Sequence, residues 1–403
     1  MNQDQPIHPG PLHDIRVLDL SRVLAGPFAA MTLGDMGAEV IKVEQPGEGD
    51  ETRAWGPPFA GGESAYFLAV NRNKRSVTLN LKHAEGRALL LDFVRRADVL
   101  IENFKLGTLE RMGLDDETLW GVNPGLIHAS ITGFGRTGPY AEYGGYDFVV
   151  QGLAGIMGVT GEAQGEPMKV GIAIVDITAA LFALNGVLAA LYARKETGRG
   201  QRVDVSLLQA AMGWLANVGQ NYLVSGEDPK RFGNAHPNIV PYQVFHAADK
   251  PLALASANPN QFRKFCQLAG KPDLAEDPRF RTNADRLAHR DQLVAIVQSL
   301  IEKRPAAEWV TLLNENGVPA GPINSVAQAF ADPQVQALDI VQTLQHPTAG
   351  PLPVVGSPIG LSETPVRPRT APPLLGADTD AVLSKVLGLD AMQIEALRRE
   401  GAI

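Results

Sequence analysis

The chain has 403 residues, a formal net charge of −8 at pH 7 and one cysteine, Cys266. This length exceeds one ordinary domain, so we expect two domains or one large domain with an insertion. The acidic balance disfavours nucleic-acid binding, and a single cysteine excludes an internal disulfide framework and a cysteine-based metal site. The polar N-terminal stretch lacks the regions of a signal peptide, and the most apolar window, 177–193, is short for a membrane span. We therefore expect a cytoplasmic protein without a membrane segment.

The first third of the chain alternates short apolar runs with helical patterns. Strands are predicted at Ile15–Ser21, in the run that begins at Ala38, and at 75–82, 99–104 and 126–134. The first helix is predicted to begin at Gly26-Pro27 and to end at Gly37. This alternation predicts an α/β fold with a doubly wound parallel sheet, which binds ligands at the carboxyl ends of its strands.

Polar and basic residues gather at these predicted strand ends. They are Ser21-Arg22, Glu44-Gln45, Lys82, Asn103-Phe104 and, one short helix later, Arg111, with Arg53, Arg72, Lys74, Arg75 and Arg136 in the loops between. Such a cluster can hold phosphates without a Walker motif, which this sequence lacks. The GxGxxG match at 133–138 leads into Pro139-Tyr140 rather than an apolar helix, so we reject NAD binding there.

A lone acid, Asp176, stands between the apolar run Ile172–Val175 and a long Ala/Leu-rich helical pattern. Asp is a favoured N-cap, and a role as a cap alone is the simpler interpretation. The positive end of the helix dipole favours the ionised carboxylate, which keeps it available as a nucleophile. The choice between these two roles needs further evidence.

The composition becomes polar near Gly226, and the pattern changes after it. A hairpin is predicted in YQVFHAADKPLALAS with its turn at 247–250, and helices are predicted at 260–269, 286–302 and 306–315. Proline-rich loops follow, and the final stretch DAMQIEALRREGAI has a helical pattern. We therefore expect a large domain over 1–225, a smaller α+β domain over 226–335, and a segment over 336–403 that returns to the large domain.

Several stretches together resemble class III CoA-transferases, the formyl-CoA/carnitine CoA-transferase group. They are RVLAGPFAAMTLGDMGAEVIKVEQPGEGDETR, NRNKRSVTLNLK, IENFKLGTLERMGL, SITGFGRTGPYAEYGGYDFVVQGLAGIM, GIAIVDITAALFALNGVLAALYARKETGRGQRVDVSLL, GVPAGPIN and PPLLGADTD. The resemblance implies a large Rossmann-like domain built from both ends of the chain, an inserted smaller domain, and an interlocked homodimer.

The resemblance also implies roles for individual residues. Asp176 stands at the position of the family's nucleophile, and Gln45 stands where some relatives carry an Arg near the CoA phosphates. The residues that align with CoA contacts are Val23, Leu24, Ala25, Leu79, Lys82, Asn103, Phe104, Lys105, Arg111 and Arg136.

Within the family, the segments NAHPNIVPYQVF, DETRAWGPPF and NRNKRS look most like succinyl-CoA:glutarate (dicarboxylate) CoA-transferases. This implies succinyl-CoA as donor and a short dicarboxylate such as glutarate as acceptor. Arg53 and His236 are candidates for binding the distal carboxylate, and for His236 a structural hydrogen bond is an equal alternative. Residues 256–261 replace a glycine run of formyl-CoA transferases, which disfavours a formyl or oxalyl substrate.

A carboxylate nucleophile suits CoA transfer because its anhydride and thioester both keep the acyl group activated. We expect an aspartyl-CoA thioester on Asp176, with oxyanion donors from amides that follow it or from a small-domain loop. Coenzyme A is the co-substrate, and no metal or tightly bound cofactor is expected. One alternative is an α-methylacyl-CoA racemase, which needs a His where this chain has Tyr146. The other is a non-catalytic CoA-binding protein, which gives no reason for Asp176.

Overall fold

The computed structural model describes residues 9–403, so most of the polar N-terminal stretch that lacks signal-peptide features lies outside the described residues. The chain forms two compact units. The large unit contains the chain up to Ala154, Val170–Trp214 and Leu338–Ile403, and the small unit contains Gly155–Lys169 and Leu215–Ala337. The segment 155–169 belongs to the small unit because Arg231 donates hydrogen bonds to carbonyls within it. The structural division therefore begins at Leu215, before the change in composition at Gly226.

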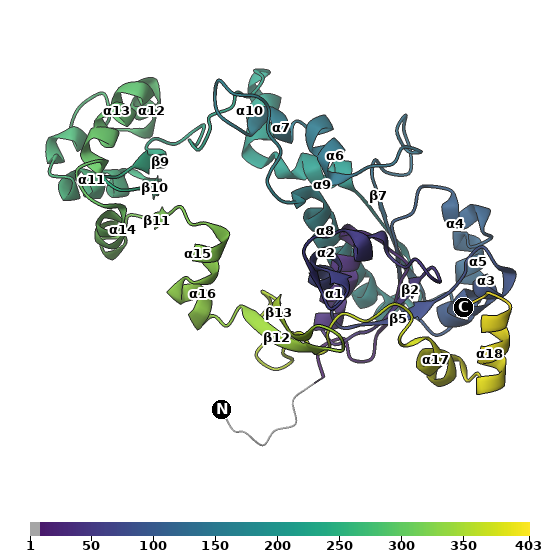
Figure 1. The fold of residues 1–403 in the computed structure, drawn as a ribbon. Coiled ribbons are helices and arrows are strands. Elements are labelled where there is room, and N and C mark those ends of the chain that lie inside the picture. Colours follow the sequence, from purple (N-terminus) through teal and green to yellow (C-terminus); the bar gives the residue numbers. More distant parts are fainter. Residues whose placement is uncertain (1–8) are drawn as a thin grey trace. The chain divides into compact units, whose positions relative to one another are not determined.

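The large unit is built on a sheet of six parallel strands (Figure 1). In spatial order the strands are β5 (Lys74–Thr78), β2 (Glu39–Glu44), β1 (Arg16–Asp19), β6 (Val99–Glu102), β7 (Ile127–Thr132) and β8 (Arg202–Ser206). The chain starts at the centre with β1, moves outward through β2 and β5, and then crosses to β6, β7 and β8. The prediction of a doubly wound parallel sheet is confirmed.

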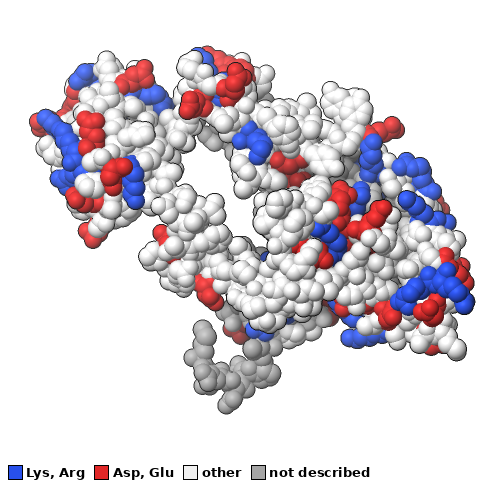
Figure 2. All heavy atoms as spheres, in the orientation of Figure 1, with Lys and Arg blue, Asp and Glu red and all other residues white. Residues whose placement is uncertain are grey.

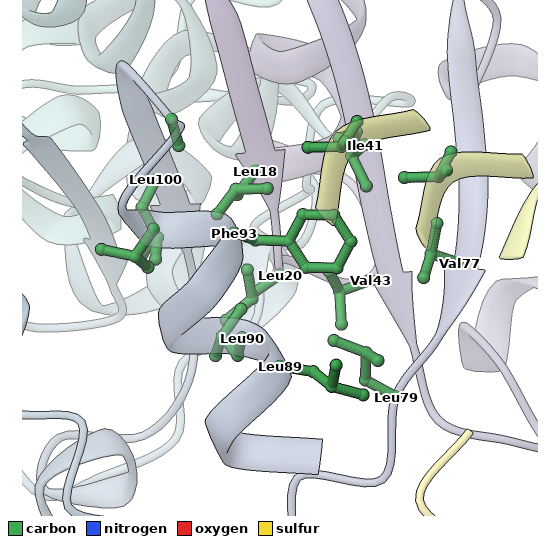
Figure 3. Packing of buried hydrophobic residues seen from close by; sticks show 14 of the residues in the cluster. Leu18, Leu20, Ile41, Val43, Val77, Leu79, Leu89, Leu90, Phe93 and Leu100 are labelled. Carbon is green, nitrogen blue, oxygen red and sulfur yellow. The ribbon is translucent and has the colours of Figure 1, made fainter. Parts of the chain in front are cut away.

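One face of this sheet carries the main apolar core. Phe93 of α3 (Ala84–Val94) lies over Leu18 and Leu20 of the β1 region and Ile41 and Val43 of β2 (Figure 3). These strand residues alternate in sequence, so they point to the same side of the sheet. The C-terminal segment adds side chains to the same core: Val382, Leu383, Val386, Ile394 and Ile403.

The other elements of the large unit cover the sheet and its edges. The helices are α1 (Ala25–Asp35), α2 (Ala65–Val70), α4 (Thr108–Arg111), α5 (Asp116–Val122), α6 (Asp147–Leu153), α8 (Ile174–Thr197), α9 (Leu207–Trp214), α17 (Thr379–Val382) and α18 (Ala391–Arg399). Shorter elements are η1 (Glu51–Ala54), the π-helical turn η3 (Leu383–Leu387), and the strand pair β3 (Phe59–Ala60) and β4 (Glu63–Ser64). By length and composition alone α8 could cross a membrane; in this structure it packs on one side against α1, α9, β7 and β8.

The small unit has a three-stranded antiparallel sheet of β11 (Ala320–Pro322), β10 (Pro251–Ala255) and β9 (Tyr242–His246). The predicted hairpin is β9 and β10 and is confirmed, whereas the helix predicted at 286–302 is divided in two at His289. Buried aromatic side chains, Phe245, Phe262, Phe265, Phe280 and Trp309, fill the core. The helices are α7 (Ile156–Val159), α10 (Ala216–Ser225), α11 (Pro259–Leu268), η2 (Pro272–Ala275), α12 (Asn283–Ala288), α13 (Arg290–Ile301), α14 (Ala306–Glu315), α15 (Val326–Phe330) and α16 (Pro333–Ala337).

The proline-rich stretch after Leu338 contains a hairpin that the sequence pattern does not predict, formed by β12 (Val341–His346) and β13 (Gly350–Val355). Pro351 and Pro353 lie on its exposed side and alternate with the buried Leu352 and Val354. A two-stranded sheet consists of edge strands, where a missing N–H is tolerated. The prolines therefore make the regular alternation of exposed and buried residues difficult to recognise in the sequence.

Candidate active site

The candidate site lies where the strand order of the large unit reverses, between the carboxyl ends of β1 and β6. The Arg22 N–H donates to Asn103 Oδ1 over 2.8 Å, and Asn103 Nδ2 donates to the Arg22 carbonyl over 2.7 Å. The residues that follow the two strands are therefore joined directly. Open α/β sheets bind their ligands in the crevice at such a switch point.

Two cavities of the large unit open at this place, with volumes of about 270 Å³ and about 360 Å³. We call them the Asp176 cavity and the Lys82 cavity, after one residue that lines each. Both are lined by Arg22, Glu51 and Phe104, so they are neighbouring parts of one surface.

Most of the residues predicted to contact CoA line these two cavities. In the Asp176 cavity they are Val23, Leu24, Ala25, Asn103, Phe104 and Lys105, and in the Lys82 cavity they are Gln45, Leu79, Lys82 and Phe104. Arg111 lines neither of them and donates a hydrogen bond to Thr108 Oγ1. Arg136 lines a third, smaller cavity and pairs with Glu110 over 3.6 Å. The cavity that Arg136 lines also contains Phe104 and Lys105 of the Asp176 cavity, so Arg136 lies beside the site, whereas Arg111 lines none of the three cavities.

The loop from β1 to α1 has an unusual backbone that buried charges hold in place. Val23 has φ +70°, a left-handed conformation that is strained for a β-branched residue. The buried Lys42 Nζ donates to the Ser21 carbonyl and to Asp50 Oδ2, each over 2.9 Å. Asp50 Oδ1 in turn accepts the Val23 N–H over 3.4 Å. Strain that buried contacts enforce is typical of functional sites.

A second buried ion pair supports the end of β1. Lys74 Nζ donates to Asp19 Oδ2 over 2.8 Å, and Asp19 Oδ1 accepts the Ser21 N–H over 3.0 Å. Burial lowers the pKa of the Lys74 ammonium to about 8, although the charge of Asp19 opposes this. These charges are paired within the protein, so they act on the shape of the site rather than on a ligand.

Asp176 lines the Asp176 cavity, but it is not the N-cap that the sequence suggests. The run before it is no strand; α8 begins at Ile174, its N-cap residue is the apolar Ala173, and Asp176 is the third helical residue. The acceptor for the first turn comes from another helix, because Asp147 Oδ2 accepts the N–H groups of Val175 over 2.7 Å and Asp176 over 3.3 Å. The interpretation of Asp176 as a simple cap is therefore wrong.

The same contacts correct one of the two predicted sources of oxyanion donors, the amides at the start of α8. The Val175 and Asp176 amides bind Asp147, and the Ile177 N–H donates to the Ala173 carbonyl over 3.1 Å. These N–H groups at the start of α8 thus already have hydrogen-bond acceptors within the protein. By contrast, α1 begins after the apolar Leu24, which has no side-chain acceptor for the amides of the first turn. Leu24 and Ala25 line the cavity that contains Asp176.

The electrostatics of Asp176 also differ from the expectation. Burial first, and then the neighbouring Asp147 carboxylate, raise the pKa of the Asp176 carboxyl to about 7. Desolvation and like-charge repulsion therefore outweigh the helix dipole, which would favour the ionised form. Burial and the same two carboxylates raise the pKa of the Tyr66 phenol to about 12. A carboxyl with such a perturbed pKa in a cavity indicates a functional site.

The two candidates for binding a distal carboxylate have protein partners of their own. Arg53 forms ion pairs with Glu44 and Glu63 and lies 3.7 Å from the centroid of the Phe67 ring. His236 belongs to the small unit, where its Nδ1 accepts the Asn238 N–H over 3.0 Å. Both arrangements favour a structural role, and for His236 this is one of the two alternatives stated above.

Asp147 is the residue that sequence reasoning missed. It follows Tyr146, which lines the Asp176 cavity at the place where a racemase needs a His. The sequence comparison with the racemase used position 146 only and gave no role to the acid at position 147. The available signal was an Asp at the start of a helical pattern, Asp147–Leu153, which is as favourable a helix-start residue as Asp176 itself.

Charges elsewhere on the surface are mixed. On the face drawn in Figure 2, positive and negative residues are interspersed and no continuous positive stripe is visible. Among residues 9–403, no group of three or more His, Cys, Asp and Glu side chains is placed to hold a metal ion.

The fold and this site are those of an α/β enzyme with a carboxylate in its ligand-binding cavity, and comparison with known proteins identifies its family. Residues 12–379 match the model of CoA-transferase family III, so the chain belongs to this family and is a CoA-transferase. Acyl-CoA thioesters are the substrates of such enzymes.

Similar proteins of known activity match over nearly the whole length. The chain is 48% identical over 389 residues to a succinate–glutarate CoA-transferase of Agrobacterium fabrum, which covers 95% of this chain and 97% of the relative. It is 42% identical over 393 residues to the succinyl-CoA:glutarate CoA-transferase of Mus musculus, covering 98% of this chain and 90% of the relative. A solved CAIB/BAIF family protein from Brucella suis has a TM-score of 0.83 and 46% identity, with 94% of this chain and 99% of that chain covered.

Proposed function

We propose that this enzyme transfers CoA from succinyl-CoA to glutarate through a covalent thioester on Asp176. The observation that carries the proposal is the position of Asp176: its carboxyl lines a cavity that adjoins the crevice at the strand ends. Burial and a neighbouring charge, rather than a cationic partner, set its raised pKa, which marks an unusually basic carboxylate. The names of the two relatives described above support the choice of donor and acceptor.

The first half-reaction consists of two acyl transfers. An Asp176 oxygen attacks the thioester carbonyl carbon of succinyl-CoA, the C–S bond breaks, and CoA leaves as a thiolate. The thiolate then attacks the Asp176 carbonyl carbon of the mixed anhydride, and succinate leaves with the electron pair of the broken C–O bond. The net charge is conserved, and the enzyme now carries CoA as a thioester.

The second half-reaction reverses these steps with the acceptor. Glutarate attacks the enzyme thioester, CoA thiolate leaves, and the thiolate then attacks the glutaryl carbonyl to release glutaryl-CoA and free Asp176. A serine nucleophile would form an ordinary ester and lose the activation of the acyl group. Each intermediate on a carboxylate stays reactive, so no external energy source is required.

The two cavities suit the two parts of acyl-CoA. The Lys82 cavity offers Lys82 and Gln45 for the phosphates and Leu79 and Met112 as apolar walls. The Asp176 cavity then receives the thioester end, and amides of the first turn of α1 supply oxyanion donors near Ala25. Of the cations in the Asp176 cavity, Arg22 pairs with Glu51, whereas Lys105 is our candidate for the acceptor's distal carboxylate.

The enzyme is further proposed to act as an interlocked cytoplasmic homodimer, with no bound metal or organic cofactor. Large apolar side chains on α6, α8 and α9 are exposed in the single chain, including Phe148, Phe182, Tyr192, Met212 and Trp214. Exposed apolar areas of this kind are typical of protein interfaces. Light scattering after size exclusion measures the mass directly, and a monomer would contradict the dimer.

The mechanism is tested by incubating the enzyme with succinyl-CoA, quenching the reaction, and digesting the protein for mass spectrometry. We expect a CoA adduct on the peptide that contains Asp176, no adduct in Asp176→Asn, and loss of transfer in that variant. Glu196→Gln, at the exposed end of the same helix, is the matched control and should keep both. Turnover retained by Asp176→Asn would overturn the mechanism. A panel of dicarboxylates and monocarboxylates with succinyl-CoA tests the acceptor, and a marked preference for another acid would contradict glutarate.

A further inference from the structure

The Asp147 carboxylate joins three segments of the large unit at the start of α8. Its Oδ2 accepts the N–H groups of Val175 and Asp176, and its Oδ1 accepts a hydrogen bond from Gln151 Nε2. Gln151 Oε1 in turn accepts the Val170 N–H over 2.8 Å. Asp147 is only 8% exposed and Gln151 is fully buried, so this network is a fixed part of the unit. The backbone position of Asp176 is therefore set by a side chain from α6.

Both oxygens of Asp147 accept hydrogen bonds, which is the arrangement of a carboxylate. Its charge is stabilised where it lies, because the first turn of a helix favours a negative group. Asp176 differs, since its hydrogen bond to Asp147 uses the main-chain N–H, and both causes that shift its pKa raise it. The two neighbouring acids therefore differ: hydrogen bonds stabilise Asp147 as a carboxylate, whereas this negative charge disfavours the carboxylate form of Asp176.

The negative charge of Asp147 favours one side of the proposed reaction over the other. When Asp176 forms an anhydride or a thioester, its own negative charge disappears and a thiolate or a released acid carries it away. A fixed negative charge beside Asp176 therefore disfavours the free carboxylate and leaves the neutral covalent forms unaffected to first order. Other ionisable groups near Asp176 are Tyr66 from α2 and, around the cavity, Arg22, Glu51, Lys105, Tyr143 and Tyr146.

We propose that Asp147 is a positioning residue for CoA transfer: it seats the first turn of α8 through two main-chain hydrogen bonds, and its charge shifts Asp176 from the free carboxylate toward the covalent intermediates. The proposal rests on the covalent mechanism above. It adds a role to a residue that does not itself touch the reacting atoms.

Two variants separate the hydrogen bonds from the charge. Asp147→Asn removes the charge, but its amide N–H groups then face Gln151 Nε2, which is also a donor. In the double variant Asp147→Asn/Gln151→Glu, the new amide oxygen at position 147 accepts from α8, its N–H donates to the new carboxylate at position 151, and that carboxylate accepts the Val170 N–H. The double variant keeps every hydrogen bond of the network and moves the charge one side chain away from Asp176. Asp390→Asn, which changes the cap residue of α18 and lies in neither cavity, is the matched control.

The first measurement is the ratio of CoA-modified to free enzyme at fixed succinyl-CoA and succinate, by intact-protein mass spectrometry. We expect Asp147→Asn to lower this ratio about tenfold, the change that one pKa unit of Asp176 represents. The double variant should give an intermediate ratio, and Asp390→Asn the wild-type ratio. The second measurement is the pH dependence of kcat, whose acid limb should move to lower pH in the same order.

Wild-type ratios and acid limbs in both Asp147 variants would overturn the proposal and leave Asp147 as a helix cap alone. If Asp147→Asn does not fold, the double variant decides by itself, because its hydrogen bonds are retained. Absence of the CoA adduct in the wild-type enzyme would instead overturn the covalent mechanism, and so distinguishes a failure of the proposed function from a failure of the role of Asp147.

Discussion

Arg53 holds Glu44 through two parallel hydrogen bonds, from Nε to Oε2 over 2.9 Å and from Nη2 to Oε1 over 2.7 Å. Glu44 ends β2, and the same carboxylate also accepts the Asp50 N–H over 2.9 Å and the Ser76 hydroxyl over 2.6 Å. This bidentate pair therefore fixes the loop that carries Asp50 and, through it, the backbone around Val23. A flat guanidinium fork is needed for this geometry, and an ammonium cannot reproduce it.

Replacing Arg53 by Lys should therefore affect stability more than substrate binding. We expect Arg53→Lys to lower the free energy of unfolding by about 1–3 kcal/mol, because buried acceptors of Glu44 and Glu63 lose donors. The KM for the acceptor acid should stay within about twofold of wild type, a change of less than about 0.5 kcal/mol. Chemical denaturation and initial rates measure the two effects. Arg75→Lys, in a partly exposed pair with Glu39, is the control with little expected loss. A large rise in acceptor KM at unchanged stability would restore Arg53 as an acid-binding residue.

Asn103 should matter for acyl-CoA binding rather than for the chemical step. Asn103→Ala removes both hydrogen bonds that join the ends of β1 and β6. With about 0.5–1 kcal/mol lost for each, or about 1–2 kcal/mol in total, we expect the KM for succinyl-CoA to rise roughly 5- to 30-fold. Asn316→Ala removes one exposed hydrogen bond in the small unit and should leave KM unchanged. A fall in kcat without a change in KM would show that the contact acts on the reaction instead.

The rate should fall in acid because Asp176 must be ionised to attack. Its pKa of about 7 predicts that kcat/KM decreases tenfold for each pH unit below about 7 and levels off above it. Binding of CoA measured by calorimetry over the same range separates this effect from titration of the ligand phosphate. An acid limb near pH of about 4, the ordinary value for Asp, would mean that the folded enzyme does not raise the pKa of Asp176.

The same carboxyl should destabilise the folded state at neutral and alkaline pH. Between pH of about 4 and 7, folded Asp176 keeps its proton while unfolded Asp176 loses it, so stability falls as pH rises. Asp176→Asn removes this titration and should be more stable than wild type by about 1–3 kcal/mol above pH 7. The advantage should shrink below pH of about 7 and disappear near pH of about 4. Urea unfolding at several pH values tests this, and a pH-independent difference would contradict it.

The alternation of apolar runs was sufficient to predict the parallel sheet and its ligand-binding edge. Most of these strands carry short runs of apolar residues, such as Val17-Leu18 in β1 and Val99–Ile101 in β6, and helical patterns separate them, so the pattern can be recognised locally. The residues that line the cavities could be predicted for the same reason: Arg22, Lys82 and Asn103 follow the ends of β1, β5 and β6 within four residues. The contacts of Asp147 with Asp176 and of Arg53 with Pro373 could not be predicted, because they join residues distant in sequence.

The state of Asp176 also required the structure. A sequence shows that an acid stands near the start of a helix, and the dipole then suggests a stabilised charge. Burial and the approach of Asp147 depend on the packing of α6 against α8, and they reverse the sign of the effect. The hairpin of β12 and β13 was not predicted for a different reason. Prolines on its outer side interrupt the strand pattern, which becomes evident only from the pairing of β12 with β13.

The route of the chain has a consequence for its synthesis on the ribosome. Val382, Ile394 and Ile403 belong to the same core as Leu18 and Phe93, and the Ala402 carbonyl accepts the Asn80 N–H over 2.8 Å. The face of the N-terminal sheet that α3 covers therefore stays incompletely covered until residues beyond 380 have been translated. The inserted small unit carries its own core and can fold during that interval. This nascent chain should depend on chaperones until its final helices arrive.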